Sequence, residues 1–185
     1  MSSVPVPGGV QHNVAMTERT LLLLRHAKSS WAEVMPDRER PLNRRGRRDA
    51  AAVGELLAKR GVRSDVALLS PAERTRETWR RAADAGAVAT AVVESDVLYD
   101  AESADIVDVL RGLPDDVTTV IVVAHFPGIP ETVAYLSEGR GSEAAWDVVR
   151  SGFPTAGLAT LILEGAWADI DALGAELVRF DVPRG

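Results

Sequence analysis

The chain has 185 residues, with 21 lysines and arginines against 27 aspartates and glutamates, three histidines and no cysteine. This length favours one domain, and an apolar fraction of 46% is ordinary for a folded core and excludes a wholly disordered chain. The absence of cysteine excludes disulfides, thiolate metal sites and cysteine nucleophiles, and a net charge of -6 disfavours a general nucleic-acid binder.

Residues 1–16 are rich in Pro, Gly and Ser and lack the basic and apolar regions of a secretory signal. We therefore predict a flexible N-terminal tail over 1–16, in which His12 is a solvated bystander, and a single domain over 17–185. No apolar run approaches the roughly 18–20 residues that cross a bilayer. A cytoplasmic protein with no membrane partner and no nucleic-acid partner is expected.

Short apolar runs alternate with segments of helical spacing along the rest of the chain. Strands are predicted at 20–24, 66–69, 88–93, 117–124, 156–163 and 177–180. Helices are predicted at 46–60, 72–85, 103–111 and from a Pro-Gly turn to about residue 136, with Ser103 as an N-cap and Pro71 at a helix start. This alternation predicts an α/β fold, a three-layer sandwich with a mostly parallel central sheet and helices on both faces.

Two histidines follow two of the predicted buried strands. His26 comes directly after LLLLR, and His125 comes directly after TVIVVA. Either one alone is most simply a polar residue that ends a strand. Because the carboxyl ends of parallel strands meet at one edge of the sheet, where ligands usually bind, the pair is a candidate site.

Two arginines join the histidines in this prediction. Arg25 precedes His26, and Arg74 falls in the first turn of a predicted helix, where a bound anion would offset its unfavourable position in the helix dipole. Guanidinium groups suit bidentate phosphate binding. The sequence contains no Walker or Rossmann glycine motif, and two arginines would repel a dication. We therefore predict phosphate chemistry without a metal or any other cofactor.

The residues at this predicted site resemble a known family. Residues 24–29 (LRHAKS) resemble the Arg-His-Gly/Ala signature of the histidine phosphatase superfamily, the phosphoglycerate mutase-like enzymes. Residues 25–31 together with 40–46 (RPLNRRG) are similar to its short phosphohistidine phosphatase branch. Residues 70–78 (SPAERTRET) resemble the second signature, and 123–128 (VAHFPG) resemble the third, which is usually His-Asn-Pro and here has Phe126. The resemblance spans roughly residues 20–182.

This resemblance implies a role for each of the four residues. His26 would be the nucleophile that takes the phosphoryl group, and Arg25, Arg74 and His125 would bind the phosphoryl oxygens. The implied activity is a metal-independent phosphatase that acts on phosphohistidine in a protein. Two alternatives remain open: a phosphatase of small phosphorylated metabolites on the same fold, and a catalytically silent phosphate-binding or interaction module.

The proton donor and the basic segment are less sharply predicted. Glu94, Asp96 and Asp100 are candidate donors, but none lies in a sharp motif. Between residues 38 and 48 lies a run of six arginines, which is either a solvated face paired with nearby carboxylates or a rim that attracts an anionic substrate. Arg40 is the member most expected to contact the substrate, and Trp31 either lines the pocket or packs.

Overall fold

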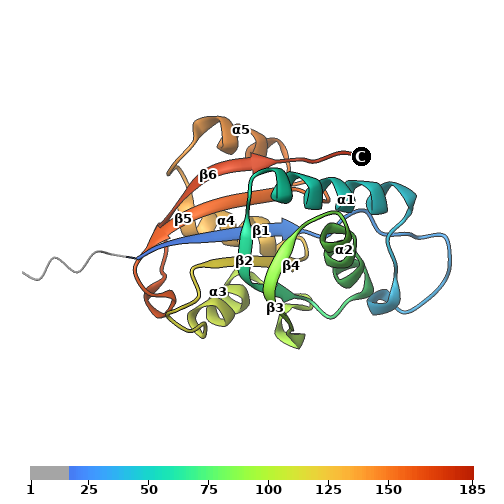
Figure 1. Ribbon diagram of the computed structural model, residues 1–185, viewed down its shortest axis with the longest axis horizontal. Helices are drawn as coiled ribbons and strands as arrows, with labels where there is room; N and C mark the ends of the chain where they lie inside the picture. Colours follow the sequence, from blue (N-terminus) through green and yellow to red (C-terminus); the bar gives the residue numbers. More distant parts are fainter. Residues whose placement is uncertain (1–16) are drawn as a thin grey trace, which may run out of the picture.

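A computed structural model describes residues 17–185 as one six-stranded sheet with helices on both faces (Figure 1). The predicted fold class is confirmed. The predicted tail, with His12, lies outside the described residues. The strands are β1 (Glu18–Arg25), β2 (Arg63–Leu69), β3 (Val88–Glu94), β4 (Thr119–Ala124), β5 (Leu158–Glu164) and β6 (Ala175–Asp181). The helices are α1 (Arg44–Lys59), α2 (Glu73–Asp84), α3 (Ser103–Arg111), α4 (Gly128–Ser137) and α5 (Glu143–Ser151), with short 3-10 turns η1 (Asp37–Glu39), η2 (Asp96–Leu98) and η3 (Trp167–Asp169).

The strand order places the candidate residues at one edge of the sheet. The order is β3-β2-β4-β1-β5-β6, in which β1 to β4 pair in parallel and β5 runs antiparallel to both of its neighbours. In the β1–β4 register Arg25 lies opposite Ala124, and in the β2–β4 register Leu69 lies opposite Val123. The residues that follow these three strands therefore emerge side by side.

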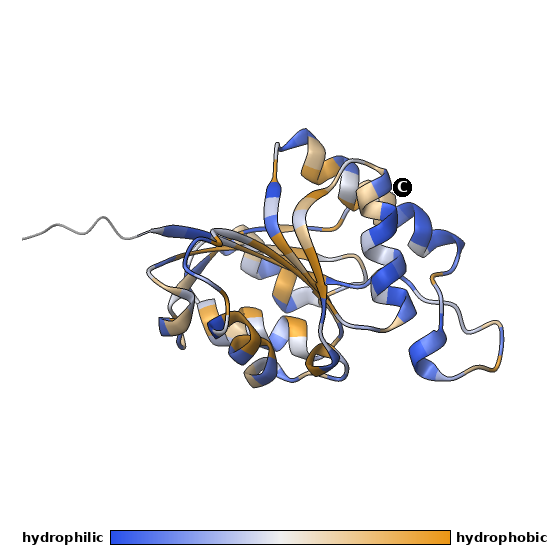
Figure 2. Ribbon diagram, turned by 60° about the horizontal axis from the view of Figure 1, so that its bottom comes forward, coloured by the Kyte–Doolittle hydropathy of each residue, from blue (hydrophilic) through white to orange (hydrophobic). Residues whose placement is uncertain are grey.

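Both faces of β1 are buried, which explains its unbroken run of leucines. Leu21 and Leu23 pack into a core with α3, α4 and α5, whereas Leu22 and Leu24 pack into a second core with α1 and α2. The apolar colouring of Figure 2 concentrates in the strands at the centre of the sheet. Burial on two sides fixes the end of β1 firmly, so the residues that follow it start from a rigid support.

Three local predictions are wrong. Helix α5 was not predicted, although its apolar residues have the spacing of an amphipathic helix; only Ala145 and Trp146 in it are buried. Ser103 is not an N-cap: Glu102 is, in a capping box with Asp105.

The third wrong prediction concerns the start of α2. This helix begins at Glu73 with Ala72 as its N-cap, so Pro71 lies one residue before the cap. Arg74 still falls in the first turn, as predicted. Within residues 17–185, no helix has both the length and the apolar character needed to cross a membrane.

Candidate active site

Hydrogen bonds to two neighbouring segments hold the end of β1 in place. The backbone N–H of His26 donates to the Ala124 carbonyl at 3.0 Å, and the N–H of Arg25 donates to the Gly157 carbonyl at 3.0 Å. A side chain at Gly157 would bring its Cβ to within 2.8 Å of the Pro154 carbonyl oxygen, so this turn requires glycine. The site is therefore built on β1, β4 and the turn before β5.

Among residues 17–185, one ring nitrogen of His26 has a hydrogen-bond partner and the other has none. Its Nδ1 lies 2.7 Å from the Ala27 carbonyl oxygen, which can only accept, so Nδ1 carries the proton and Nε2 has the lone pair. Burial is the main cause that lowers the His26 pKa to about 4; the Ala27 hydrogen bond opposes this, and the charges of Arg74, Arg25 and Arg40 add to it. At neutral pH His26 is thus an uncharged imidazole with an available lone pair.

His125 lies next to His26, with 5.2 Å between the ring centroids. Its Nε2 and the Ser70 hydroxyl oxygen are 2.7 Å apart, whereas its buried Nδ1 has no partner among residues 17–185. Burial, followed by the neighbouring His26 and Arg74, lowers the pKa of His125 to about 3. When the Ser70 hydroxyl donates to Nε2, the ring proton sits on the buried Nδ1.

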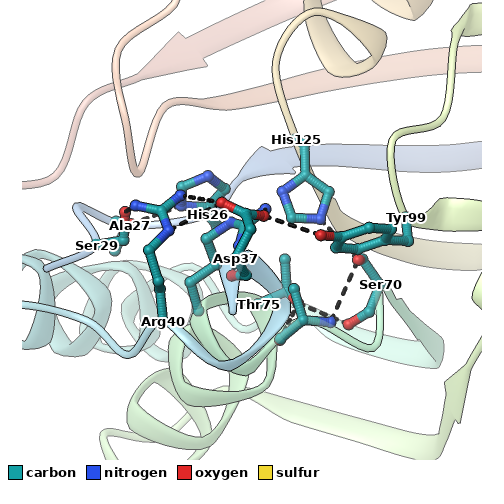
Figure 3. A network of polar contacts seen from close by, with 11 residues as sticks. His26, Ala27, Ser29, Asp37, Arg40, Ser70, Thr75, Tyr99 and His125 are labelled. Atoms are coloured by element: carbon teal, nitrogen blue, oxygen red, sulfur yellow. Dashed lines mark hydrogen bonds and ion pairs between the residues drawn. The ribbon is translucent and has the colours of Figure 1, made fainter. Parts of the chain in front are cut away.

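A carboxylate shows that the arginines of the site can hold an anion. The Arg74 guanidinium lies 2.9 Å from the Asp37 carboxylate and also donates to the Asp37 backbone carbonyl at 2.7 Å. Arg40 binds the same carboxylate at 2.7 Å and donates to the Ser29 hydroxyl at 3.1 Å. The Tyr99 hydroxyl also donates to the Asp37 carboxylate, at 2.9 Å. Figure 3 shows Asp37 between Arg40 and Tyr99, close to the two imidazoles.

The ionisation of Asp37 follows from these contacts. Burial alone would raise the pKa of its carboxyl, but hydrogen bonds from Tyr99 and Arg40 and the charge of Arg74 lower it below the usual value. Asp37 is therefore a carboxylate at neutral pH. It occupies donors of the Arg74 and Arg40 guanidinium groups.

Arg25 bounds the cluster on another side. One terminal nitrogen of its guanidinium donates to the Phe153 carbonyl at 2.6 Å, and the guanidinium carbon lies 5.1 Å from the centroid of the exposed Phe126 ring. Its buried Nε has no partner among the described residues. Arg25, His26, Arg74 and His125 thus converge as the sequence predicts, and Arg40 joins them.

The other sequence candidates lie elsewhere. Glu94 pairs with Arg76 at 2.5 Å, Asp96 pairs with Arg38, and Asp100 occupies a turn with φ of 55°. None of these three carboxylates has a hydrogen bond to His26 or His125. Within residues 17–185, no group of three or more metal-binding side chains is present.

Most arginines of the basic segment form ion pairs rather than a free rim. Arg38 pairs with Asp96, Arg45 with the buried Asp49, and Arg47 with the buried Glu77. This agrees with the interpretation of the segment as a paired face. Arg40 is also paired, with Asp37, but it differs from the others because it is buried and turned into the site. Arg44 and Arg48 have no aspartate or glutamate partner among the described residues.

Trp31 is 80% exposed and does not pack in a core; the guanidinium carbon of Arg40 lies 3.7 Å from its ring centroid. Trp31 therefore stands at the mouth of the cluster.

Three members of the cluster were missed by sequence reasoning as site residues: Asp37, Ser70 and Tyr99. Ser70 lies at the head of the second signature and could have been found there. Asp37 stands three residues before Arg40 in the basic segment and could have been considered with it. Tyr99 has no local sequence signal, because it reaches the site only through the turn that follows β3.

Comparisons with known proteins agree with this geometry. The family model described as histidine phosphatase superfamily (branch 1) matches residues 21–100. A solved structure of a candidate phosphohistidine phosphatase SixA from Nakamurella multipartitia is 35% identical and covers 90% of this chain and 96% of its own, with a TM-score of 0.77. The chain belongs to the histidine phosphatase superfamily.

Two further relatives are similar to this chain over most of its length. The candidate phosphohistidine phosphatase SixA from Agrobacterium tumefaciens is 31% identical, with a TM-score of 0.73 and coverage of 89% of this chain and 98% of its own. An uncharacterized protein of Mycobacterium tuberculosis is 36% identical over 162 residues, which are 87% of this chain and 100% of the relative. The chain is a phosphatase of this family, in its short SixA-like branch.

The RPLNRRG segment of this histidine phosphatase has a structural role that the contacts explain. Asn43 caps α1, accepting from the Gly46 N–H at 2.8 Å, and its own N–H donates to the Lys28 carbonyl at 2.9 Å. A Cβ at Gly46 would lie 2.1 Å from that same carbonyl oxygen, so only glycine lets α1 approach the loop after His26. The segment fixes the loop that carries the candidate nucleophile.

We expect both site imidazoles to stay neutral at pH 5. Their pKa values of about 4 and about 3 lie below the ordinary value of 6.5, so each neutral ring takes up a second proton only below pH 5. Histidine-ring NMR of the labelled protein from pH 7.5 to 4.5, with signals assigned through His26→Asn and His125→Gln variants, measures this. Site signals that titrate with midpoints near 6.5 would contradict it.

Proposed function

We propose that this protein removes the phosphoryl group from phosphohistidine in a protein, without a metal, through a phosphohistidine intermediate on His26. The observation that carries the proposal is the state of His26. Its Nδ1–H is held by the Ala27 carbonyl and its Nε2 lone pair is free, beside arginines that already bind a carboxylate. The names of the two SixA relatives support the phosphohistidine substrate.

The first step transfers the phosphoryl group between two imidazoles. The Nε2 lone pair of His26 forms a bond to phosphorus as the P–N bond of the substrate breaks, and the bonding electron pair returns to the substrate nitrogen. A substrate imidazole protonated on its far nitrogen leaves as neutral imidazole. The step needs no proton donor, which fits a site in which the carboxyl of Asp37 is ionised.

The second step regenerates His26. A water molecule attacks phosphorus, the P–N bond to Nε2 breaks, the electron pair returns to Nε2, and both water protons stay on the released phosphate. The Ala27 carbonyl keeps the Nδ1 proton in place throughout and stabilises the ring cation of the intermediate. Arg25, Arg40, Arg74 and the Nδ1 of His125 serve the phosphoryl oxygens, where charge develops.

A comparison of substrates with excess chelator present tests this proposal. We expect hydrolysis of a phosphohistidine protein to exceed that of alkyl and sugar phosphates by at least about 10²-fold in kcat/KM, because an alkoxide leaving group requires a general acid. Comparable turnover of a simple alkyl phosphate would contradict the role of the leaving imidazole. Turnover confined to small phosphorylated metabolites would identify a metabolite phosphatase. The absence of any turnover would identify a catalytically silent binding module, and loss of activity with chelator would show a metal requirement.

A further inference from the structure

A hollow of about 530 Å³ lies beside the candidate active site. Its walls include Arg25, Phe126, Val148, Phe153, Pro154 and Val182. Its size falls within the range of about 300–1,000 Å³ that is usual for ligand pockets. The catalytic steps described above use only Arg25 of this set, so the hollow is free for another role.

Arg25 forms a wall shared by the hollow and the cationic cluster. Its guanidinium donates to the Phe153 carbonyl at 2.6 Å and lies 5.1 Å from the Phe126 ring centroid, and it directly precedes His26 in the chain. A substrate whose phosphoryl group is held at His26 and Arg25 therefore places its neighbouring atoms at the entrance of the hollow.

The chemistry of the hollow selects an apolar group. Apart from Arg25, its one polar side chain is that of Ser151, whose hydroxyl donates to the Val148 carbonyl at 2.8 Å. The hydroxyls of a sugar or polyol phosphate would lose water there without gaining partners, which is unfavourable. An aliphatic or aromatic group gains free energy by covering these apolar walls.

The surroundings favour a polypeptide as the molecule that carries this group. Phe126 is 58% exposed and stacks on Arg25, and Trp31 is 80% exposed and stacks on Arg40, so two arginines of the cluster each carry an exposed aromatic ring. Val34, on the same loop as Trp31, is fully exposed. A polypeptide can contact the apolar groups on both arginines while its phosphorylated side chain enters the cluster.

We propose that this hollow binds a large apolar side chain that neighbours the phosphorylated histidine in the substrate polypeptide, and that Phe126 determines this specificity. The inference rests on the proposed function and adds sequence preference to it. Phe126 stands where the family usually has asparagine, so an apolar wall replaces an amide at the entrance.

Binding of two peptides tests the inference. Both carry a non-hydrolysable phosphohistidine analogue; one has leucine on either side of it and the other has serine. We expect the wild type to bind the leucine peptide about tenfold more tightly, as burial of one aliphatic side chain allows. The Phe126→Ala variant is expected to lose most of this preference, whereas Phe126→Leu keeps it.

Two controls separate specificity from catalysis. Phosphoramidate has no group that could enter the hollow, so kcat/KM for it should be the same in Phe126→Ala and the wild type. Tyr135→Ala removes a partly exposed aromatic ring from α4, outside the hollow, and should keep the leucine preference. An equal fall with phosphoramidate in Phe126→Ala would mean that Phe126 acts by holding Arg25, which overturns the inference.

The remaining outcomes distinguish the inference from the proposed function. Equal affinity of the wild type for the two peptides, together with hydrolysis of phosphohistidine protein, overturns the apolar subsite and leaves the proposed function intact. A wild type that binds neither peptide and hydrolyses only small phosphate esters overturns both.

Discussion

Replacing His26 by alanine should reduce hydrolysis of phosphohistidine protein by at least about 10⁴-fold, since removal of a covalent nucleophile leaves only binding and charge stabilisation. The ring is nearly buried beside a cationic cluster, and its Nε2 carries a lone pair. The neighbouring His125 presents no free lone pair when the Ser70 hydroxyl donates to its Nε2, because its Nδ1 then carries the ring proton. Steady-state kcat/KM with wild type and variant measures the loss. His26→Asn, which keeps a polar side chain of similar reach, guards against misfolding of the alanine variant.

The intermediate itself gives a sharper readout than the rate. Wild type mixed with radiolabelled phosphohistidine protein and quenched in base should retain label that acid releases, as expected for a P–N bond. His125→Gln is the matched control: it removes the neighbouring imidazole and slows turnover, yet keeps the nucleophile and should still take up label. Label that survives in His26→Asn, or undiminished hydrolysis by His26→Ala, would place the chemistry on another residue.

The convergence of the histidines could be predicted because it depends on topology. A run of apolar residues that ends in a polar one marks a strand end, and parallel pairing brings such ends together whatever the side chains are. The β1–β4 register places Arg25 opposite Ala124, so His26 and His125 follow as neighbours. The sequence predicted only the shared edge; that β1 and β4 are neighbours in the sheet is seen in the structure.

The rest of the site depends on side-chain contacts that no periodicity records. Asp37 belongs to a short 3-10 turn in an otherwise irregular loop, and its position follows from pairing with Arg74, 37 residues away in the chain. Tyr99 reaches the cluster after η2, through a turn whose geometry depends on Asp100. Glu94 was a candidate proton donor in the sequence, together with Asp96 and Asp100, but the structure shows it paired with Arg76 at the surface.

The contacts of Asp37 also bear on substrate binding. Its carboxylate pairs with terminal nitrogens of Arg74 and Arg40, the guanidinium groups proposed to bind the phosphoryl oxygens. A phosphoryl group carries more negative charge than a carboxylate and can engage both arginines and His125 together. If the phosphoryl group uses these donors, as proposed, it competes with Asp37 for Arg74 and Arg40.

Arg74 is where this competition can be measured. We expect Arg74→Lys to lower kcat/KM by about 10²–10³-fold, because an ammonium keeps the charge but cannot present the planar, two-pronged contact of a guanidinium to developing oxyanions. The inhibition constant for inorganic phosphate should rise in the same variant. Thermal unfolding checks that the loss reflects the site, since Arg74 is 4% exposed and its neighbours depend on it.

The matched control lies two residues further along α2. Arg76→Lys makes the same chemical change at a guanidinium that pairs with Glu94 and is 43% exposed. An exposed pair of this kind contributes little, about 0–1 kcal/mol, so kcat/KM and phosphate inhibition should stay close to wild type. Equal losses of kcat/KM in the two lysine variants would mean that positive charge on α2, rather than bidentate contact by Arg74, attracts the substrate. Arg74 would then not be one of the residues that bind the phosphoryl group.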